Sequence, residues 1–255
     1  MLVVASPIKN REWILPKFIE CLKRLDVSYD DVIYLFLDDA SDDNSLGLLQ
    51  EFALHDARVM ILKNTIPFAK NTSSRDIRNR KELYHHLSAL RNRLIDTAIG
   101  FGADRVFMVD SDILVVPQIV STLENHDVDY CATVVSNTKT IKPADLKEKE
   151  WYDSCNILVE NKGGALTHMQ PVLLNKLITC NVSGAAFLVK GHALKSGAKF
   201  EYHLHGEDVG YCYQLAEHDI QIHVDTTIMA VHAFTRTSFQ QACNTYEALY
   251  HSLST

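Results

Sequence analysis

The sequence predicts an α/β fold: a single domain with a mostly parallel central sheet flanked by helices, and a smaller mixed region. Two observations lead to this prediction. Short apolar runs rich in β-branched residues alternate with helical patterns through the first half of the chain, as in consecutive βαβ units. Two of these runs end in paired carboxylates, and polar groups at the carboxyl ends of parallel strands are typical of ligand sites in such folds.

Composition and charge exclude several classes of protein. The 255 residues are 47% hydrophobic and 22% charged, which is enough apolar material for one large core. The net charge of −7 argues against nucleic acid or an anionic membrane as a partner. The six cysteines form no Cys-x-x-Cys pair, and neither a transmembrane segment nor a leader is expected from the apolar patterning. We therefore expect a cytoplasmic protein with reduced thiols.

The first half predicts alternating strands and helices. Apolar runs predict strands at residues 2–5, 32–37, 58–62 and 106–109. Apolar residues at helical spacing predict helices over residues 14–25, 46–52 and 83–98. Asp42 and Asp43 are candidate caps for the second of these helices. Residues 63–80 form a long basic loop in this interpretation, and it could close over a ligand or remain solvated.

The second half is less regular. The strands expected there cover residues 129–135, 184–189, 220–224 and 228–231. The helices expected there cover residues 207–218 and 239–253. Residues 136–180 carry weak patterns and two adjacent glycines, so we expect an irregular insertion around the site. Because neither a repeat nor a flexible linker is visible, residues 1–255 are expected to form one domain.

The segment from Val106 to Asp112 is the most informative in the chain. Four apolar residues are followed by Asp110, Ser111 and Asp112, so a buried strand delivers two carboxylates to the rim of the sheet. Oxygen ligands of this kind suit Mg²⁺ or Mn²⁺, which often bind beside substrate phosphates. The alternative is a solvated turn in which one of the aspartates caps a helix.

Five motifs occur in a fixed order along the chain. They are Val3–Arg11, the acidic turn Leu37–Asp43, Ala89–Asn92, Asp110–Asp112 and Gly206–Asp208. This order resembles the nucleotide-sugar-dependent glycosyltransferases of the GT-A fold, from Met1 to about His232. Leu90 departs from that family, because it interrupts the Ala-Arg-Asn segment. The resemblance implies a nucleotide-binding half, residues 1–112, and an acceptor and catalytic half, residues 113–255.

The resemblance also implies a divalent cation, Mn²⁺ or Mg²⁺. Asp112 would bind the cation, and His232 would complete its ligands as a neutral imidazole. Asp110 would lie close to the ion or the ribose, and Ser111 would lie beside the donor. The cation would stabilise the charge that develops on the leaving pyrophosphate. The alternative for His232 is a histidine packed at a strand end.

The nucleotide would be bound by the first two strand ends. Asp39 is the best candidate for reading the base, and Asp38 is the alternative; both could instead cap the following helix. The first loop would lie against the nucleoside through Ser6 and Pro7. Arg11 or Arg91 would pair with phosphate, although a surface ion pair is the common role of such an arginine.

Asp208 is the first candidate for the general base, and Glu207 is the second. In an inverting transfer one carboxylate deprotonates the acceptor hydroxyl; in a retaining enzyme Asp208 would orient the acceptor instead. Acidic residues at the start of a helix are also stabilised by the helix dipole, and this role is compatible with catalysis. Gly184 and Ala185 would allow a sugar to approach the backbone closely. Trp151 and Tyr152 could stack on an acceptor or belong to the core.

The donor is expected to be a nucleoside-diphosphate sugar, with UDP favoured over GDP. The acceptor is open: a glycan, a lipid-linked sugar, a protein or a modified base, with nucleic acid disfavoured by the acidic charge. Two other functions stay open at this point. One is a sugar nucleotidyltransferase, which would normally have a glycine-rich opening loop that residues 6–11 lack. The other is a non-catalytic sugar- or nucleotide-binding module.

Overall fold

A sheet of nine strands carries the site, within the residues that the computed structural model describes: 1–64, 77–137, 151–152, 156–169, 172–173 and 176–253. The strands from the first half are β1 (Leu2–Ile8), β2 (Val32–Asp39), β3 (Val59–Asn64) and β4 (Arg105–Val109). Those from the second half are β5 (Ile113–Leu114), β6 (Tyr130–Asn137), β11 (Leu177–Cys180), β13 (Ala186–Lys190) and β14 (Ile222–His232).

The first half of the sheet is parallel. β1 lies between β2 and β4 and is parallel to both, and β3 is parallel to β2. All four strands predicted in this half are confirmed. Because parallel strands end at the same edge, Pro7, Asp39 and Asp110 lie at one rim of the sheet.

The second half of the sheet is mixed, as the predicted fold class requires. β13 is antiparallel to β4 and β6, whereas β14 is parallel to β6 and antiparallel to β5 and β11. The prediction of two short strands at 220–224 and 228–231 was wrong, because these residues belong to the single strand β14. Its register with β6 shifts between Asp225 and Met229. Asp225 accepts hydrogen bonds from the N–H and hydroxyl of Thr227 there, which stabilises the bulge.

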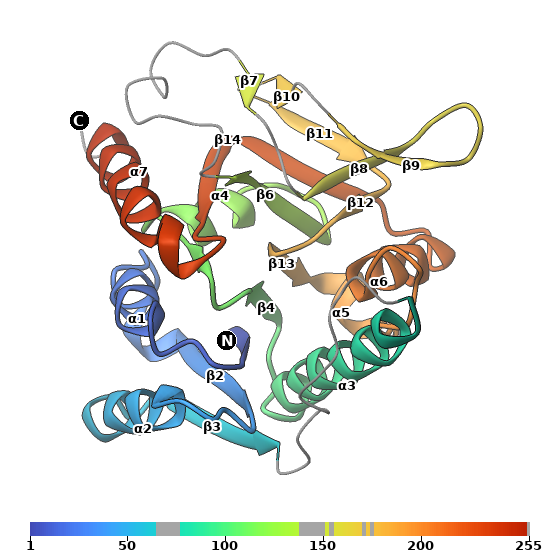
Figure 1. Ribbon diagram of the computed structural model, residues 1–255. Helices are drawn as coiled ribbons and strands as arrows, with labels where there is room; N and C mark the ends of the chain where they lie inside the picture. The colour runs from blue at the N-terminus through green and yellow to red at the C-terminus, as the bar shows by residue number, and fades with distance from the viewer. Residues whose placement is uncertain (65–76, 138–150, 153–155, 170–171, 174–175, 254–255) are drawn as a thin grey trace.

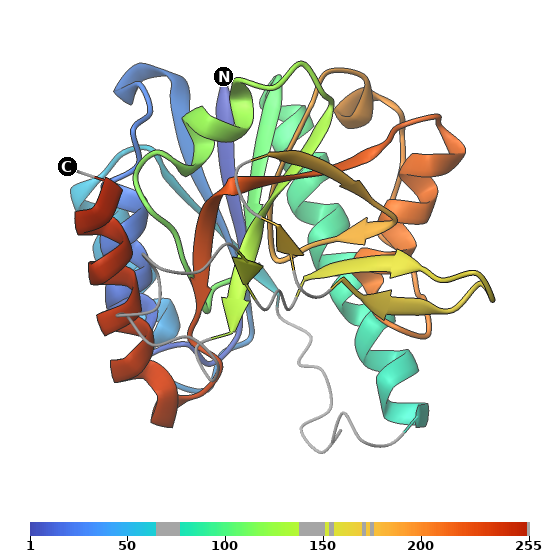
Figure 2. The same ribbon diagram turned by 90° about the horizontal axis from the view of Figure 1, so that it is seen from above.

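Helices cover both faces of the sheet. Their bounds are α1 (Leu15–Lys23), α2 (Ser45–His55), α3 (Ile77–Gly100), α4 (Ile119–Glu124), α5 (Gly191–Lys195), α6 (Glu207–Glu217) and α7 (Phe239–Leu253). Figures 1 and 2 show α1, α2 and α7 on one side of the sheet and α3 and α6 on the other. Of these helices, α4 and α5 were not predicted. Asn44 occupies the N-cap position of α2 without a side-chain cap, whereas the predicted Asp43 accepts a hydrogen bond of 3.0 Å from the N–H of Ser45, the first residue of the helix.

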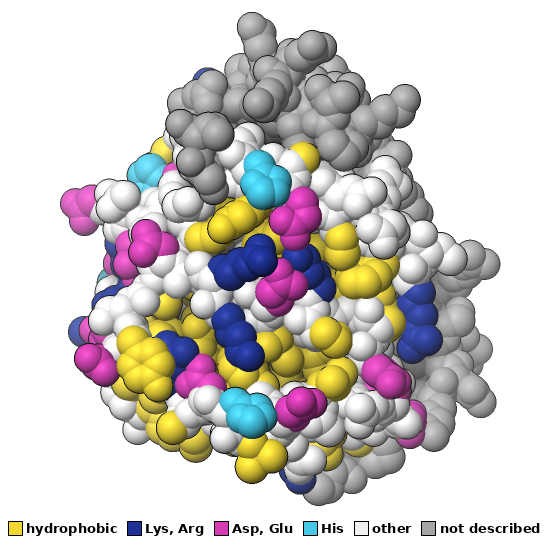
Figure 3. All heavy atoms as spheres, turned by 90° about the vertical axis from the view of Figure 1, so that its left-hand side faces the viewer, with side chains coloured by type: hydrophobic (Ala, Val, Ile, Leu, Met, Phe, Trp, Pro, Cys, Tyr) yellow, Lys and Arg dark blue, Asp and Glu magenta, His cyan; other side chains and the backbone are white. Residues whose placement is uncertain are grey.

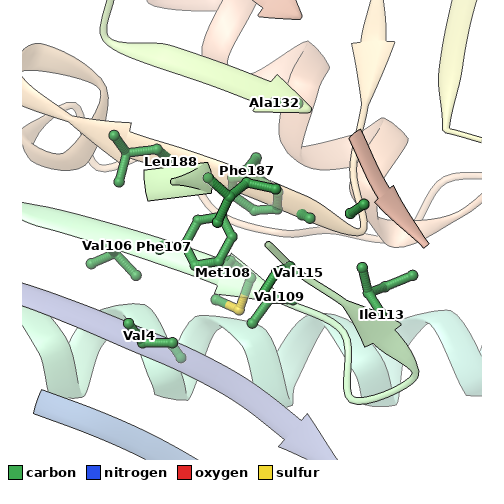
Figure 4. Packing of buried hydrophobic residues seen from close by; sticks show 14 of the residues in the cluster. Val4, Val106, Phe107, Met108, Val109, Ile113, Val115, Ala132, Phe187 and Leu188 are labelled. Carbon is green, nitrogen blue, oxygen red and sulfur yellow. The ribbon is translucent and has the colours of Figure 1, made fainter. Parts of the chain in front are cut away.

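The core is built around β4. Its residues Val106 to Val109 are fully buried, and Phe107 pairs with Val4 of β1 on one side and with Leu188 of β13 on the other (Figure 4). Burial of each large apolar side chain contributes about 1.5–3 kcal/mol of stabilisation. Such a strand is held rigidly, and it therefore gives the carboxylates at its end a fixed position.

The insertion expected over residues 136–180 is not irregular where the structure describes it. It contains short antiparallel strands. β7 (Trp151–Tyr152) pairs with β10 (Val172–Leu173), and β8 (Ile157–Glu160) lies between β9 (Leu166–His168) and β12 (Val182–Ser183), which directly follows the insertion. The proposed stacking of the Trp151 and Tyr152 side chains lies outside the described residues. So does most of the predicted basic loop, at residues 65–76.

Charges of both signs intermingle at the centre of the face that α1, α2 and α7 form (Figure 3). Lys17 of α1 pairs with Glu247 of α7 at 2.5 Å, and Arg24 pairs with Glu20 at 2.6 Å. Such a mixed face offers no broad basic surface for a polyanion. Across the described helices, none combines the length and the apolar character needed to cross a bilayer.

Candidate active site

Two adjoining pockets lie at the carboxyl rim of the sheet. The two pockets are named here after the ligands that the sequence analysis expects. The first, called the donor pocket, has a volume of about 190 Å³ and is lined by Pro7, Ile8, Lys9, Arg11, Asp39, Leu87, Leu90, Arg91, Asp110, Ser111 and Asp112. The second, the acceptor pocket, has a volume of about 310 Å³ and is lined by Tyr84, Arg91, Asp110, Ile113, Asn156, Ala185, His205, Gly206, Glu207, Asp208, His232 and Phe234. Arg91 and Asp110 line both pockets, so the two spaces meet at this pair.

Asp39 enters the donor pocket as a firmly held carboxylate. It is 4% exposed, accepts a hydrogen bond of 2.6 Å from Nδ2 of Asn64, and lies 2.9 Å from Nε2 of His86 through each of its oxygens. Asp38 is equally buried but is not among the described residues that line the pocket. Of the two aspartates, therefore, Asp39 has access to a ligand there.

The first loop contributes backbone and a lysine. Pro7 lines the donor pocket, whereas Ser6 is fully buried and does not line it among the described residues. Lys9 was missed in the sequence analysis. Its Nζ donates to the carbonyl oxygens of Asp39 and Ala40, the latter at 2.7 Å. Ala40 has a positive φ of 50°, so Lys9 stabilises the strained turn that follows Asp39.

Asp112 and His232 are brought together by the end of β14. His232 pairs with Ile113, and the N–H of Ala233 donates to the carbonyl oxygen of Asp112 at 2.9 Å. As a result Nε2 of His232 lies 3.7 Å from Oδ1 of Asp112. The other oxygen of Asp112 accepts a hydrogen bond of 2.9 Å from Nη2 of Arg11. Burial acts to raise the pKa of Asp112, but His232 and Arg11 outweigh it and the pKa is lowered.

The donor set at Asp112 fits a small divalent cation in part. Two atoms that bind one ion at about 2.1 Å lie about 3 Å apart when the bonds are perpendicular, and further apart at wider angles. Oδ1 of Asp112 and Nε2 of His232 lie 3.7 Å apart, so both can bind the same ion. Within the described residues, however, no three His, Cys, Asp or Glu side chains are arranged to hold a metal. Asp110, like Asp112, is paired with an arginine, because its Oδ1 accepts a hydrogen bond of 2.6 Å from Nη2 of Arg91.

Arg91 joins the two acidic motifs. From the middle of α3, its Nη2 donates to Asp110 and its Nε donates to Oε1 of Glu207 at 3.0 Å. Burial acts to lower its pKa, but the two carboxylates raise it well above the ordinary value. For Asp110 burial raises the pKa, and the positive charge of Arg91 offsets only part of this increase. The buried Glu207 is therefore occupied by an ion pair and positions Arg91.

Asp208 has the environment of a general base. Its carboxylate fills the space in which side chains at two glycines would stand: a Cβ on Gly184 would lie 2.6 Å from Oδ2, and a Cβ on Gly206 would lie 2.5 Å from Oδ1. Oδ1 accepts a hydrogen bond of 2.9 Å from the N–H of Val209. Burial and the neighbouring charge of Glu207 raise the pKa of Asp208 to about 6. Such a carboxylate can accept a proton near neutral pH.

Several residues of the acceptor pocket were not predicted: Tyr84, Asn156, His205 and Phe234. His205 directly precedes the Gly206–Asp208 motif and Phe234 follows His232 by two residues, so proximity to the motifs was an available signal for both. No signal in the sequence pointed to Asn156, because its place at the pocket depends on tertiary contacts. Its side chain forms hydrogen bonds with backbone groups of Thr133, Val135 and Gly184. Ala185, which was predicted, has a positive φ of 67°.

No family model matches this sequence, and no curated protein does. Solved structures do resemble the fold. TarS residues 1–349 from S. aureus, in complex with UDP-GlcNAc, aligns at 14% identity with a TM-score of 0.56, covering 90% of this chain and 58% of that chain. The mannosyltransferase PcManGT from Pyrobaculum calidifontis, in complex with GDP-Man and Mn²⁺, aligns at 12% identity with a TM-score of 0.58, covering 99% and 63%.

These likenesses confirm the predicted fold class, a GT-A type α/β arrangement. This chain spans 58% of the TarS fragment, 38% of the longer TarS chain and 63% of PcManGT.

Proposed function

We propose that the protein is a glycosyltransferase that moves a sugar from a nucleoside diphosphate to an acceptor hydroxyl. The observation that carries the proposal is the position of Asp208: a carboxylate with a raised pKa, seated between two glycines, in a pocket that adjoins the donor pocket through Arg91 and Asp110. The fold supports it as well, because solved structures of that fold hold UDP-GlcNAc in one case and GDP-Man with Mn²⁺ in another.

Residues 1–112 bind the donor in this proposal. Asp39 accepts hydrogen bonds from the base, Pro7 lies against the nucleoside, and Arg11 pairs with the pyrophosphate. UDP is favoured over GDP as the donor nucleotide, and the thermal-shift series below compares the two directly. Among the described residues, Asp38 and Ser6 do not line this pocket, and Asp38 instead accepts a hydrogen bond of 3.4 Å from the N–H of Ser41 in the turn after β2.

Asp112 and His232 hold a divalent cation, Mn²⁺ or Mg²⁺, with Asp110 and Ser111 beside it. The ion supplies positive charge against the leaving pyrophosphate. The chain's own contribution is to fix the pair: β14 carries His232 to Asp112 through the strand pairing with β5. Arg91 keeps Asp110 oriented between the two pockets.

Residues 113–255 bind the acceptor and perform the transfer. Asp208 takes the proton of the attacking hydroxyl as the oxygen forms its bond to the anomeric carbon. The bond from that carbon to the β-phosphate oxygen breaks, and its electron pair leaves with the nucleoside diphosphate. A single displacement of this kind inverts the anomeric configuration. The acceptor is a glycan, a lipid-linked sugar or a protein rather than nucleic acid.

A thermal-shift series with nucleotides tests the donor site. UDP, GDP, UDP-glucose, UDP-GlcNAc and GDP-mannose are each added with and without Mn²⁺ to the wild type and to Asp112→Ala. We expect a nucleotide to raise the Tm in the presence of Mn²⁺, by a margin that grows with ligand concentration, and Asp112→Ala to lose the metal-dependent part. No shift with any nucleotide would overturn the proposal.

Transfer itself separates an enzyme from a sugar-binding module. The wild type should release the nucleoside diphosphate from its donor, while Asp208→Asn should bind the donor with the same Tm shift but release product about 10²–10⁴ times more slowly. A module without catalysis would show binding and no release. Proton NMR of the product then reports whether the anomeric configuration is inverted.

A further inference from the structure

An aromatic ring forms part of the wall of the acceptor pocket. Phe234 is 48% exposed, although it is a large apolar side chain, and it lines the same pocket as Asp208. Its ring meets that of His232 edge to face, with 5.0 Å between the centroids and 69° between the planes. This contact restricts the orientation of the ring just beyond the end of β14, so Phe234 presents an aromatic surface to the pocket.

The charges of this pocket are mainly negative. Three carboxylates line it, Asp110, Glu207 and Asp208. Among the described lining residues, Arg91 is the only side chain that is always positive, and its charge is engaged by Asp110 and Glu207 at 2.6 and 3.0 Å. A phosphate or carboxylate on the acceptor would meet these carboxylates in a partly desolvated space, which costs free energy. The cation proposed at Asp112 and His232 does not offset this cost, because its charge is neutralised by the pyrophosphate of the bound donor.

The size of the pocket limits what can lie between the ring and the base. A volume of about 310 Å³ is at the low end for small-ligand pockets and suits a compact ring. A pyranose has an apolar C–H face, which can pack on an aromatic ring, and hydroxyl groups on its rim. One of those hydroxyls would then reach the carboxylate of Asp208, while His205 at the same pocket offers a further polar contact.

We propose that the acceptor is an uncharged pyranose unit that stacks on Phe234 and presents its hydroxyl to Asp208. The inference rests on the proposed function and narrows its acceptor class: neutral sugars are accepted, and phosphorylated or carboxylated sugars are rejected. Phe234 determines acceptor specificity, whereas Asp208 receives the proton of the attacking hydroxyl and the nucleoside diphosphate carries away the electron pair of the broken bond.

The test compares neutral with charged acceptors. Methyl glucoside, galactoside, mannoside and N-acetylglucosaminide are offered together with their 6-phosphates, using the donor identified by the thermal-shift series. Donor hydrolysis without acceptor is measured in parallel. We expect transfer to at least one neutral pyranoside, with a kcat/KM at least tenfold higher than for its 6-phosphate.

Variants of Phe234 test the ring itself. Phe234→Ala should raise the acceptor KM about tenfold, whereas Phe234→Tyr, which keeps the ring, should retain the wild-type KM. Phe101→Ala is the matched control, because Phe101 is 40% exposed but lies after α3 and lines neither pocket among the described residues.

Two results would overturn the inference alone. One is preferential transfer to a 6-phosphate, and the other is a Phe234→Ala variant that behaves like Phe101→Ala toward every neutral acceptor. A wild type that neither binds nor hydrolyses any donor would instead overturn the proposed function, and the acceptor inference with it. Because donor binding and hydrolysis are read separately from acceptor KM, the two failures are distinguishable.

Discussion

Nη2 of Arg11 lies 2.9 Å from Oδ2 of Asp112, so the carboxylate proposed to hold a cation is already paired with a guanidinium. Arg11 comes from the loop after β1 and Asp112 from the turn after β4, two neighbouring strands of the sheet. Both side chains are partly exposed, at 31% and 17%. An ion pair of this exposure contributes about 1 kcal/mol or less, and a ligand can therefore displace it.

Removal of Arg11 should strengthen binding of the metal alone. In Arg11→Met, Asp112 loses a competing positive charge, and we expect the Kd for Mn²⁺ without nucleotide to fall by up to about fivefold, as a pair worth about 1 kcal/mol implies. Titration calorimetry or the Mn²⁺ electron paramagnetic resonance signal measures this. Arg24→Met is the control, since Arg24 pairs with Glu20 on the surface of α1. An unchanged Kd would mean that Arg11 does not compete with the ion.

The rate of transfer should depend on the ionisation of Asp208. Because the pKa of Asp208 is raised to about 6, the proposed base would be protonated below that pH, and kcat/KM should rise as the pH increases through about 6. Asp208→Asn should lack this limb as well as most of the rate. A wild-type profile that is flat between pH 5 and 7.5 at saturating metal would contradict the assignment.

Ionisation of Asp208 should lower the stability of the fold, although it should raise the rate of transfer. The folded-state pKa is higher than the ordinary value of 3.8, so the folded protein binds the proton more tightly than the unfolded chain does. Stability contributed by Asp208 is therefore present below about pH 4 and is lost as the pH rises to about 6. Asp208→Asn should be more stable than the wild type at pH 7, and the difference should shrink toward pH 4. Urea unfolding at both pH values measures it.

Gly184→Ala should impair catalysis more than folding. The new Cβ would lie 2.6 Å from Oδ2 of Asp208, so the carboxylate must move. Displacement of a catalytic group by about 1 Å costs roughly 100-fold in rate, and overpacking costs about 1–3 kcal/mol. Gly100→Ala is the matched control, because nothing lies within 4 Å of its added Cβ. Equal activity of the two variants would show that Asp208 is not held by Gly184.

Arg91→Met should destabilise the fold. It leaves Asp110 and Glu207 without the guanidinium that both of them bond, and loss of one partner of a buried ion pair costs about 3–5 kcal/mol. Adding Glu207→Gln should recover part of this loss, because one of the orphaned charges is removed. The free energies of unfolding of the single and double variants measure the coupling. Strict additivity would mean that the two residues act independently.

The sequence by itself determined the strands and helices of the first half and the acidic motifs at their ends. Those elements were predictable because a buried parallel strand reads as a continuous apolar run, and β4 is one, from Val106 to Val109. The strand-end position of Asp39 and Asp110 followed from the same pattern. The C-terminal helix, Phe239–Leu253, was also predicted, since its amphipathic spacing is local.

Only the tertiary structure decided which of the predicted residues meet. His232 reaches Asp112 because β14 pairs with β5, and Arg91 of α3 bonds Glu207 at the start of α6. Asp38 and Asp39 are adjacent in sequence, yet only Asp39 is among the described residues that line the donor pocket. The physical reason is that strand pairing and side-chain direction join residues far apart along the chain, whereas periodicity reports only what neighbours in sequence do.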